Sequence, residues 1–421
     1  MEIENIDQGP IDLAQLEELS LVAGDMIKKI RARMLLTSPS KTTPVFKAEE
    51  VATLCGMTKG QFQHRLGTRK DLPTGMLSET GRKRFFTLAE TRSWVIDSRK
   101  AFARPDGAEA VTIAIANFKG GTTKTTTAMT LAQGLTLLGH RVLVVDTDPQ
   151  ASLTTFFGYL PDVEIDEEDT VLALVTGQQS SIRPMIRSTY WDGLDLVPSC
   201  SQLFNAEMYL PNKQIRTKNF EFWAVLDYGI QDVRDDYDVI IIDTPPALSY
   251  VTINSLMAAS AIIMPLPPQT LDYASAGQFW SIFSDLASGI FKQRGYEKTF
   301  DFIHILLSRV EPTDVSNLVR GWIVGTYGEK VLPQEIPKTA MAALRSAEFG
   351  TVYDATQGDS KDREELKDRT YKRARDAYDS CVISIESSIR KAWNRQIRGM
   401  ASFTGGVPLT AQINSITTYR D

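Results

Sequence analysis

Cysteine is scarce, and its spacing matches no common cysteine-based site. Only Cys55, Cys200 and Cys381 occur among the 421 residues. An odd number of widely scattered cysteines predicts neither a disulfide framework nor a zinc site. We therefore expect most of them to be buried packing residues.

Long apolar runs are also lacking. No stretch of about eighteen consecutive apolar residues occurs, and the N-terminal residues begin acidic, without the basic start and apolar stretch of a secretion signal. These absences predict a cytoplasmic protein with no membrane partner. The net charge of −6 excludes a protein that is basic over its whole surface, but it leaves room for local basic patches that meet nucleic acid.

The length predicts two or three domains, and composition breaks suggest where they lie. Ile11 to Leu36 carries one apolar stripe, which predicts a helix that packs either on its own chain or on a second copy. A linker rich in Ser, Thr and Pro follows, so residues 1–44 form the first segment. A compact unit is expected over residues 45–107, a larger domain over 108–400, and a tail without apolar periodicity over 401–421.

The larger domain alternates apolar, β-branched runs with helical stretches. Nearly continuous apolar strands separated by helices indicate a parallel sheet covered on both faces, so the predicted fold class is α/β, doubly wound. The predicted strands are Val111 to Ala116, Arg141 to Asp146, Val239 to Asp243, Ala261 to Pro265 and Phe302 to Ser308.

A phosphate-binding loop is predicted directly after the first of these strands. The strand is followed by a small, polar loop and then by a helical stretch, Lys124 to Leu138. Gly120 and Gly121 let backbone N–H groups turn inward to form an anion nest, Lys124 can reach the β and γ phosphates, and Thr125 can place its hydroxyl on Mg²⁺. The predicted nucleotide-binding residues are Lys119, Gly120, Gly121, Thr122, Thr123, Lys124, Thr125 and Thr126.

The loop departs from the ordinary phosphate-loop pattern, because Phe118 and Thr123 stand where its two glycines belong. The segment Lys119-Gly120-Gly121-Thr122-Thr123-Lys124-Thr125 instead resembles the deviant loop of the ParA/MinD group of ATPases. The resemblance implies binding of ATP or ADP, and a dimer formed on ATP in which Lys119 reaches across to the partner's phosphates. Lys119, Lys124 and Asp148 are the expected catalytic residues.

Two acidic segments support the resemblance. Asp146 and Asp148 follow a strand at the carboxyl edge of the sheet, where α/β proteins bind ligands, and match the family's D-x-D-P-Q segment. By that match Asp148 orients the attacking water and Asp146 lies nearer the metal. Asp243 closes another strand and can hold Mg²⁺ through water. Residues 332–337, expected beyond the last strand, resemble the family's base-flanking loop, so Pro337 is a candidate adenine contact. No paired histidine occurs, so slow hydrolysis is expected.

The unit at 45–107 reads as a winged helix-turn-helix. Lys47 to Leu66 predicts two helices around Gly56, and Pro73 to Thr87 predicts a basic hairpin. The whole resembles the DNA-binding module that large plasmid-type ParA proteins carry ahead of their ATPase; a small protein-binding helical domain is the alternative. The predicted DNA-contacting residues are Lys59, Gln61, Gln63, Arg65, Arg82, Lys83 and Arg84.

A second basic region lies on the C-terminal helices and includes Lys372, Arg373 and Arg375. It predicts either a solvated charged face, because acidic residues are interspersed, or contact with DNA phosphates regardless of sequence. The resemblance to ParA favours the second reading. Dimerisation on ATP would then double this patch and make DNA binding depend on ATP.

The leading interpretation is a nucleoid-associated partition ATPase that binds DNA, works with a ParB-type partner and represses its own operon. A MinD-like ATPase that binds membrane through Ile383, Ile385, Ile389, Trp393 and Ile397 is one alternative. A transcription repressor regulated by ATP is another. A relative of the nitrogenase iron protein is disfavoured, since Cys200 and Cys381 lack the spacing for a bridging cluster.

Overall fold

The computed structural model describes residues 11–37, 41–291, 298–338, 350–354 and 369–403. The chain divides into two compact units, Met1–Thr42 and Thr43–Asp421. The first unit holds α1 (Leu13–Thr37), which confirms the predicted helix. Its apolar stripe is exposed where side chains are described, with 54% of Leu16 and 60% of Leu19 accessible to solvent. Self-association through this stripe stays a prediction.

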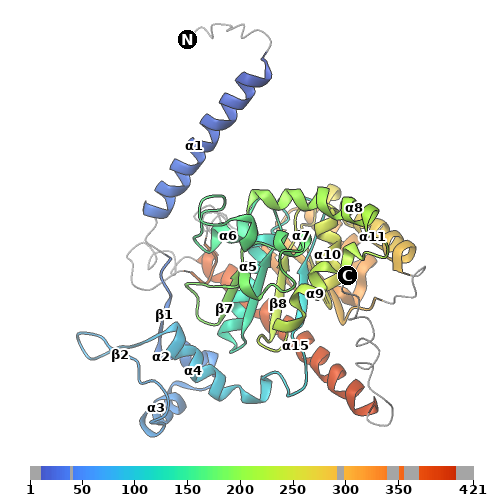
Figure 1. Cartoon of the computed structure of the whole chain (residues 1–421). Coiled ribbons are helices and arrows are strands. Elements are labelled where there is room, and N and C mark those ends of the chain that lie inside the picture. The colour runs from blue at the N-terminus through green and yellow to red at the C-terminus, as the bar shows by residue number, and fades with distance from the viewer. Residues whose placement is uncertain (1–10, 38–40, 292–297, 339–349, 355–368, 404–421) are drawn as a thin grey trace. The chain divides into compact units, whose positions relative to one another are not determined.

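The second unit begins with a small module of three helices and a three-stranded antiparallel sheet in the order β1-β3-β2 (Figure 1). Gly56 takes a φ of 66° in the turn between the first two helices, and Thr58 accepts a hydrogen bond from Gln61 N as the second helix begins. Phe62, Phe86 and Trp94 form its core. The module's elements are β1 (Val45–Lys47), α2 (Ala48–Leu54), α3 (Lys59–Thr68), β2 (Met76–Leu77), β3 (Arg84–Thr87) and α4 (Leu88–Ser98).

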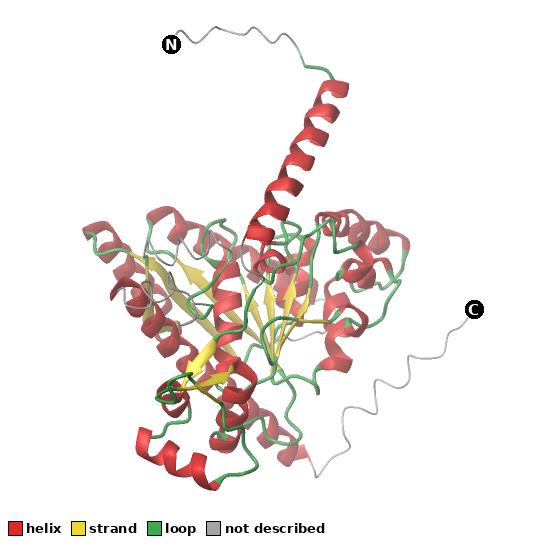
Figure 2. Cartoon of the chain, turned by 90° about the vertical axis from the view of Figure 1, so that its left-hand side faces the viewer, coloured by secondary structure: helices red, strands yellow, loops and turns green. Residues whose placement is uncertain are grey.

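An eight-stranded sheet in the order β11-β10-β9-β4-β8-β5-β7-β6 forms the centre of the larger domain, with helices on both faces (Figure 2). All neighbouring strands are parallel except β6 and β7. The doubly wound α/β fold is thereby confirmed. The strands are β4 (Val111–Ile115), β5 (Val142–Asp146), β6 (Arg187–Ser188), β7 (Leu194–Val197), β8 (Val239–Asp243), β9 (Ala261–Leu266), β10 (Phe302–Val310) and β11 (Val331–Pro337).

The segment expected to form a base-flanking loop is instead the edge strand β11. Leu332 and Ile336 are buried while Pro333 is exposed, and the strand pairs in parallel with β10. An edge strand tolerates proline because one side of its backbone needs no partner. The prediction of a loop was therefore wrong, because the prolines obscured the strand pattern.

Helix α5 lies at the centre of the packing and is buried from Thr127 to Leu137. Gly134 lets α15 approach it closely, because a Cβ there would lie 2.5 Å from Val382 Cγ2. The remaining helices are α5 (Lys124–Leu137), α6 (Ser152–Phe156), α7 (Leu172–Thr176), α8 (Ala206–Arg216), α9 (Val225–Ile230), α10 (Tyr250–Ala258), α11 (Thr270–Leu286), α12 (Asp314–Tyr327) and α15 (Arg369–Phe403).

The apolar face of α15 packs on the domain itself. Ile385 and Ile389 are fully buried and Trp393 is 1% exposed, whereas only Ile383 of that face is largely exposed. This burial argues against the membrane-binding alternative, because most of the apolar face is already covered by the domain. Nor does any helix among the described residues have the length and apolarity to cross a membrane.

Arg92 of α4 and Arg99, the residue directly after α4, join the N-terminal module to the end of α5. The Arg92 guanidinium donates to Thr136 O and His140 O, each at 3.0 Å, and pairs with Asp192 at 2.5 Å. Arg99 donates to Leu138 O at 3.2 Å. These cations donate to carbonyls in and just after the last turn of α5, where positive charge is favoured.

Glu386 of α15 completes this joint. Its carboxylate accepts from Arg99 at 2.6 Å and contacts His140 Nε2 at 2.8 Å. Burial on its own raises the pKa of Glu386, but the hydrogen bonds from His140 and Arg99 outweigh it and leave the pKa below its ordinary value. Stability from this group is therefore present above the unfolded-state pKa and is lost as the pH falls through the folded-state value.

We predict that Glu386→Ala lowers the free energy of unfolding by about 3 kcal/mol at pH 7, because the buried His140 and the half-buried Arg99 lose their carboxylate partner. Urea denaturation followed by fluorescence measures this loss. The difference from wild type should shrink as the pH falls through the lowered folded-state pKa of Glu386, where the wild-type carboxylate becomes protonated. Glu329→Ala, at an exposed position, is the control, and an equal loss in both variants contradicts the prediction.

Candidate nucleotide and DNA sites

The predicted phosphate loop joins the C-terminal end of β4 to the N-terminus of α5. Among the described residues, the backbone N–H groups of Gly120, Gly121, Thr122 and Thr123 have no hydrogen-bond acceptor. Gly121 and Thr123 both lie in the left-handed region, with φ of 73° and 74°. Unpaired donors in such a turn, at a helix N-terminus, are suited to bind an anion.

Thr123 occupies the place where the ordinary phosphate-loop pattern has its second glycine. A β-branched residue with a φ of 74° is strained, by about 1 to 2 kcal/mol. Thr123 thus adopts the left-handed backbone conformation that favours glycine, although it is not a glycine.

The two lysines of the loop have different surroundings. Lys124 is 7% exposed and its Nζ donates to Lys119 O at 3.1 Å. Burial lowers the pKa of Lys124, against the attraction of Asp243 and Asp148. The Lys119 Nζ instead pairs with Asp272 Oδ2 of α11 at 2.6 Å. Asp272 was not among the sequence candidates, because nothing in its local sequence marks it.

Asp146 is fully buried, and its carboxylate accepts hydrogen bonds from nearby residues of the same chain. It accepts from Thr154 N at 2.9 Å, from Thr154 Oγ1 at 2.7 Å and from Asp148 N at 3.1 Å. Burial, partly offset by the Thr154 hydrogen bonds, raises the pKa of Asp146 to about 7. In the structure Asp146 therefore orients the segment that carries Asp148 and the start of α6.

Asp243 lies beside Asp146, since the two are register partners on β8 and β5. Both Asp243 carboxylate oxygens are buried, and neither has a hydrogen-bond partner among the described residues. Burial and the neighbouring Asp146 raise the pKa of Asp243, whereas Thr125 and Lys124 oppose this effect. A buried carboxylate without a partner is costly unless a cation or another donor meets it.

Asp148 is partly buried at the same edge of the sheet. Its Oδ1 accepts from Gln150 N at 2.9 Å, and its backbone carbonyl accepts from Ser199 Oγ at 2.8 Å. Burial raises the pKa of Asp148, while the nearby Lys124 lowers it. The structure thus brings Lys119, Lys124, Thr125, Asp146, Asp148 and Asp243 to one end of the sheet, as the sequence predicted.

Pro337 lies in a strand and not in the expected loop, whereas Thr126 lies at the start of the expected helix. Pro337 ends β11 and pairs in register with Val310 at the end of β10. Thr126 lies in the first turn of α5, where its carbonyl accepts from Thr130 Oγ1 at 2.6 Å. Nucleotide contact by either residue stays a prediction.

The N-terminal module holds a basic groove of about 520 Å³ between α3 and the β2–β3 hairpin. Its lining includes Lys59, Gln63, Arg82, Lys83 and Arg84, together with Glu49, whose carboxylate pairs with Lys59 at 2.5 Å. The sequence predicted the first five of these residues as DNA contacts. The structure brings them together on one face. Gln61 is partly committed elsewhere, because its Oε1 accepts from Thr58 N at 2.8 Å.

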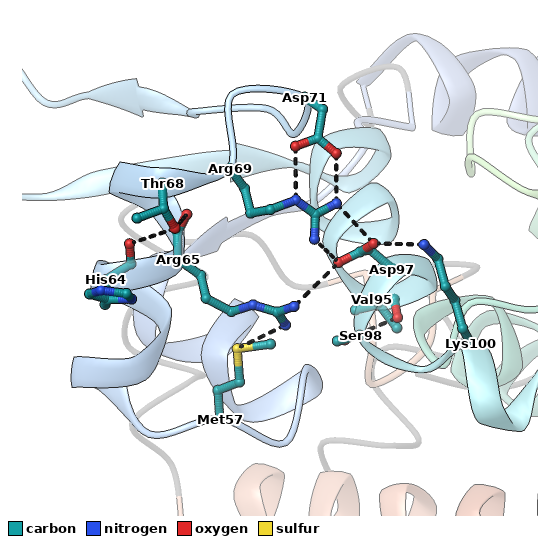
Figure 3. A network of polar contacts seen from close by, with 10 residues as sticks. All are labelled: Met57, His64, Arg65, Thr68, Arg69, Asp71, Val95, Asp97, Ser98 and Lys100. Carbon is teal, nitrogen blue, oxygen red and sulfur yellow. Dashed lines mark hydrogen bonds and ion pairs between the residues drawn. The ribbon is translucent and has the colours of Figure 1, made fainter.

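Arg65 is not among the residues that line this groove, and its side chain points toward Asp97 and Met57 (Figure 3). Its guanidinium lies 3.8 Å from Asp97 of α4 and 4.0 Å from Met57 Sδ. Arg69 pairs with the same Asp97 at 2.6 Å and lowers the pKa of that carboxyl to about 2. Arg65 therefore contributes to the contact between α3 and α4, and its contact with DNA stays a prediction. Helical position alone could not reveal this, since Asp97 is distant in sequence.

Two of the three basic residues predicted on α15 are exposed. Lys372 and Arg373 face solvent. Arg375 instead stacks on Tyr353, with Cζ 4.2 Å from the ring centroid, and donates to Val352 O at 3.1 Å. Its guanidinium is thus engaged within the domain, which corrects its assignment as a DNA contact.

Comparison with known proteins agrees with this geometry. A family model described as an AAA domain matches residues 110–293. A putative replication protein A of Rhizobium rhizogenes is 35% identical over 298 residues, which are 69% of this chain and 72% of the relative. The protein SopA of Escherichia coli is 34% identical over 246 residues, covering 58% and 62% of the two chains. The chain belongs to the ParA family.

Solved structures agree with the ParA fold. A structure described as a partition protein has a TM-score of 0.60 and 20% identity, covering 80% of this chain and 95% of the other. An ATP complex of a McdA variant from Cyanothece has a TM-score of 0.53 and 21% identity, covering 68% and 98%. At these identities the two solved structures show the fold that the chain shares with them.

We predict that Thr123→Gly raises the melting temperature of the nucleotide-free protein by roughly 1 to 3 °C, because the relief of backbone strain exceeds the entropy cost of glycine. The matched control is Thr126→Gly, three residues later in the first turn of α5, which should lower it instead. Differential scanning calorimetry measures both. A lower melting temperature for both variants contradicts the assigned strain at Thr123.

Proposed function

We propose that this partition ATPase binds Mg²⁺-ATP at residues 119–126, dimerises on ATP, and binds DNA in that state until slow hydrolysis releases it. The observation that carries the proposal is the coincidence of three features at one edge of the sheet. They are a row of unpaired backbone donors, the buried Lys124 ammonium and the partnerless carboxylate of Asp243. The backbone donors can bind the phosphate oxygens, the Lys124 ammonium can offset their negative charge, and the Asp243 carboxylate can bind the metal through water.

The residues present fit Mg²⁺. No group of three or more His, Cys, Asp or Glu side chains within the described part of the chain could hold a metal alone. The Thr125 hydroxyl and, through water, Asp243 would therefore share the ion with nucleotide phosphates. When bound, Mg²⁺ supplies positive charge that offsets the negative charge of the phosphates. Asp148 orients the attacking water, and Asp146 holds Asp148 in place.

The ion pair between Lys119 and Asp272 supports a switch at the dimer interface. The Lys119 ammonium is bound within its own chain at 2.6 Å and must leave Asp272 to reach the phosphates of a second copy. Binding of ATP by the second copy supplies the competing negative charge. Dimerisation would then depend on nucleotide.

DNA contact is assigned to two basic surfaces. The groove of Lys59, Gln63, Arg82, Lys83 and Arg84 is suited to operator DNA, through which the protein would repress its own operon. The exposed Lys372 and Arg373 of α15 are suited to phosphates of any sequence, which would bring the protein to the nucleoid. A ParB-type protein bound at the centromere would stimulate hydrolysis.

We predict that Arg82→Ala combined with Lys83→Ala weakens DNA binding and reduces the slope of log K against log salt by about 2, because two phosphate contacts are lost. Fluorescence anisotropy with duplex DNA over a salt series measures this slope. Arg65→Ala is the matched control, since it also removes a positive charge but from the inward network with Asp97. An unchanged slope in the double variant, or an equal change in Arg65→Ala, contradicts the assignment.

The function itself is tested by ATP turnover with and without non-specific duplex DNA. We expect DNA to raise a slow wild-type rate and Lys119→Ala to abolish the response. Asp272→Asn breaks the same ion pair but keeps Lys119, so it should retain the response. This control separates the role of Lys119 in the dimer from simple loss of the pair.

Other outcomes would favour other functions. Nucleotide binding without any turnover, with or without DNA, would favour a repressor in which ATP is only a regulatory ligand. A rate that responds to anionic vesicles but not to DNA would favour membrane positioning, despite the burial of the apolar face of α15.

A further inference from the structure

The C-terminal end of β10 carries a backbone distortion next to the phosphate loop. Arg309 has a φ of 53°, although it lies within the strand, and the pairing register with β11 shifts between Leu307 and Val310. A non-glycine residue in the left-handed region costs on the order of 1 kcal/mol or more, and such strain is concentrated at functional sites. We therefore expect the distorted residues to make a functional contact.

The distortion turns two neighbouring side chains onto the loop. Arg309 Nη1 donates to Gly121 O at 2.9 Å, and Ser308 Oγ donates to Thr122 O at 3.1 Å. The loop and the strand are separated by 188 and 186 residues in these two pairs. Arg309 has no ion pair among the described residues. No carboxylate there draws its guanidinium away from Gly121 O.

Peptide planarity turns these two contacts into a constraint on the loop's donors. In a trans peptide, the C=O of one residue and the N–H of the next point in opposite directions. Holding the Gly121 carbonyl toward Arg309 therefore points the Thr122 N–H the other way, and holding the Thr122 carbonyl toward Ser308 does the same for the Thr123 N–H. Both N–H groups have no acceptor among the described residues.

A third carbonyl of the loop is also occupied. Lys119 O accepts from Thr122 Oγ1 at 3.2 Å and from Lys124 Nζ at 3.1 Å. These contacts are made within the loop, whereas those of Ser308 and Arg309 come from another strand. Strand β10 thus orients the carbonyls of Gly121 and Thr122, which no contact among the described residues of the loop holds.

We propose that Arg309 and Ser308 are positioning residues that hold the carbonyls of Gly121 and Thr122 outward, so that the next two N–H groups face the β phosphate of the nucleotide. This role rests on the proposed nucleotide site. Donors fixed before binding need no reorientation when the phosphate arrives, which strengthens binding of that phosphate. The strain at Arg309 is the cost of aiming its side chain at the loop.

The role makes a prediction that a purely structural contact would not. It acts on the phosphate donors, so it should affect ADP and ATP, which carry a β phosphate, more than AMP, which does not. A general loosening of the fold would weaken all three alike.

Arg309→Gly is the decisive variant, because glycine accepts a φ of 53° without strain but has no guanidinium. Calorimetric titration of the full chain with AMP, ADP and ATP in Mg²⁺ measures affinity, and a thermal melt without nucleotide measures stability. We expect about a tenfold weaker affinity for ADP and ATP, a change below twofold for AMP, and an unchanged or higher melting temperature. Arg309→Lys, which retains a cationic donor, should recover part of the affinity.

The control is Lys338→Ala. Lys338 lies at the same end of the sheet and pairs with Glu311, so the variant removes one nearby positive charge without touching the loop. ADP affinity at the wild-type level in Arg309→Gly, or an equal loss in Lys338→Ala, overturns the proposal. Equal weakening of AMP and ADP also overturns it. Absence of ADP and ATP binding in the wild type would instead refute the nucleotide site itself.

Discussion

Helix α5 is the element on which the rest of the structure depends, because its two ends leave opposite sets of backbone groups without partners. At its N-terminus, the donors of the preceding loop stay free for an anion. At its C-terminus, Thr136 O and Leu138 O accept from Arg92 and Arg99 of the N-terminal module. One buried helix thus connects the nucleotide end of the sheet with the module that carries the basic groove. A displacement of α5 on nucleotide binding would act directly on that module.

The carboxylates beside α5 set a second constraint. Asp146 and Asp243 are adjacent and fully buried, and burial raises the pKa of both. Asp146 is stabilised by Thr154, but Asp243 has no such partner among the described residues. The fold therefore holds an uncompensated acidic group close to Lys124 and Thr125. Such a group is retained at a cost in stability, which is expected where a protein binds a cation together with a phosphate.

The sequence predicted most of this site because each group follows a strand or opens a helix, and both features have local signals. The loop, Asp148 and Asp243 were found in this way, as were the two helices around Gly56. Contacts between residues that are far apart in the sequence have no such local signal. Asp272 beside Lys119, Arg309 beside Gly121 and Asp97 beside Arg65 were therefore missed. The edge strand β11 was missed because its prolines resemble those of a loop, and the inward turn of Arg375 depends on Tyr353.

We propose that ATP, through the loop at the start of α5, controls binding to DNA. The most direct test uses Asp148→Asn, which should bind ATP but hydrolyse it very slowly. Its affinity for non-specific duplex DNA would be measured with Mg²⁺-ATP and with Mg²⁺-ADP at the same salt concentration. We expect binding to be at least tenfold tighter with ATP. Equal affinity in the two nucleotide states would contradict the claim.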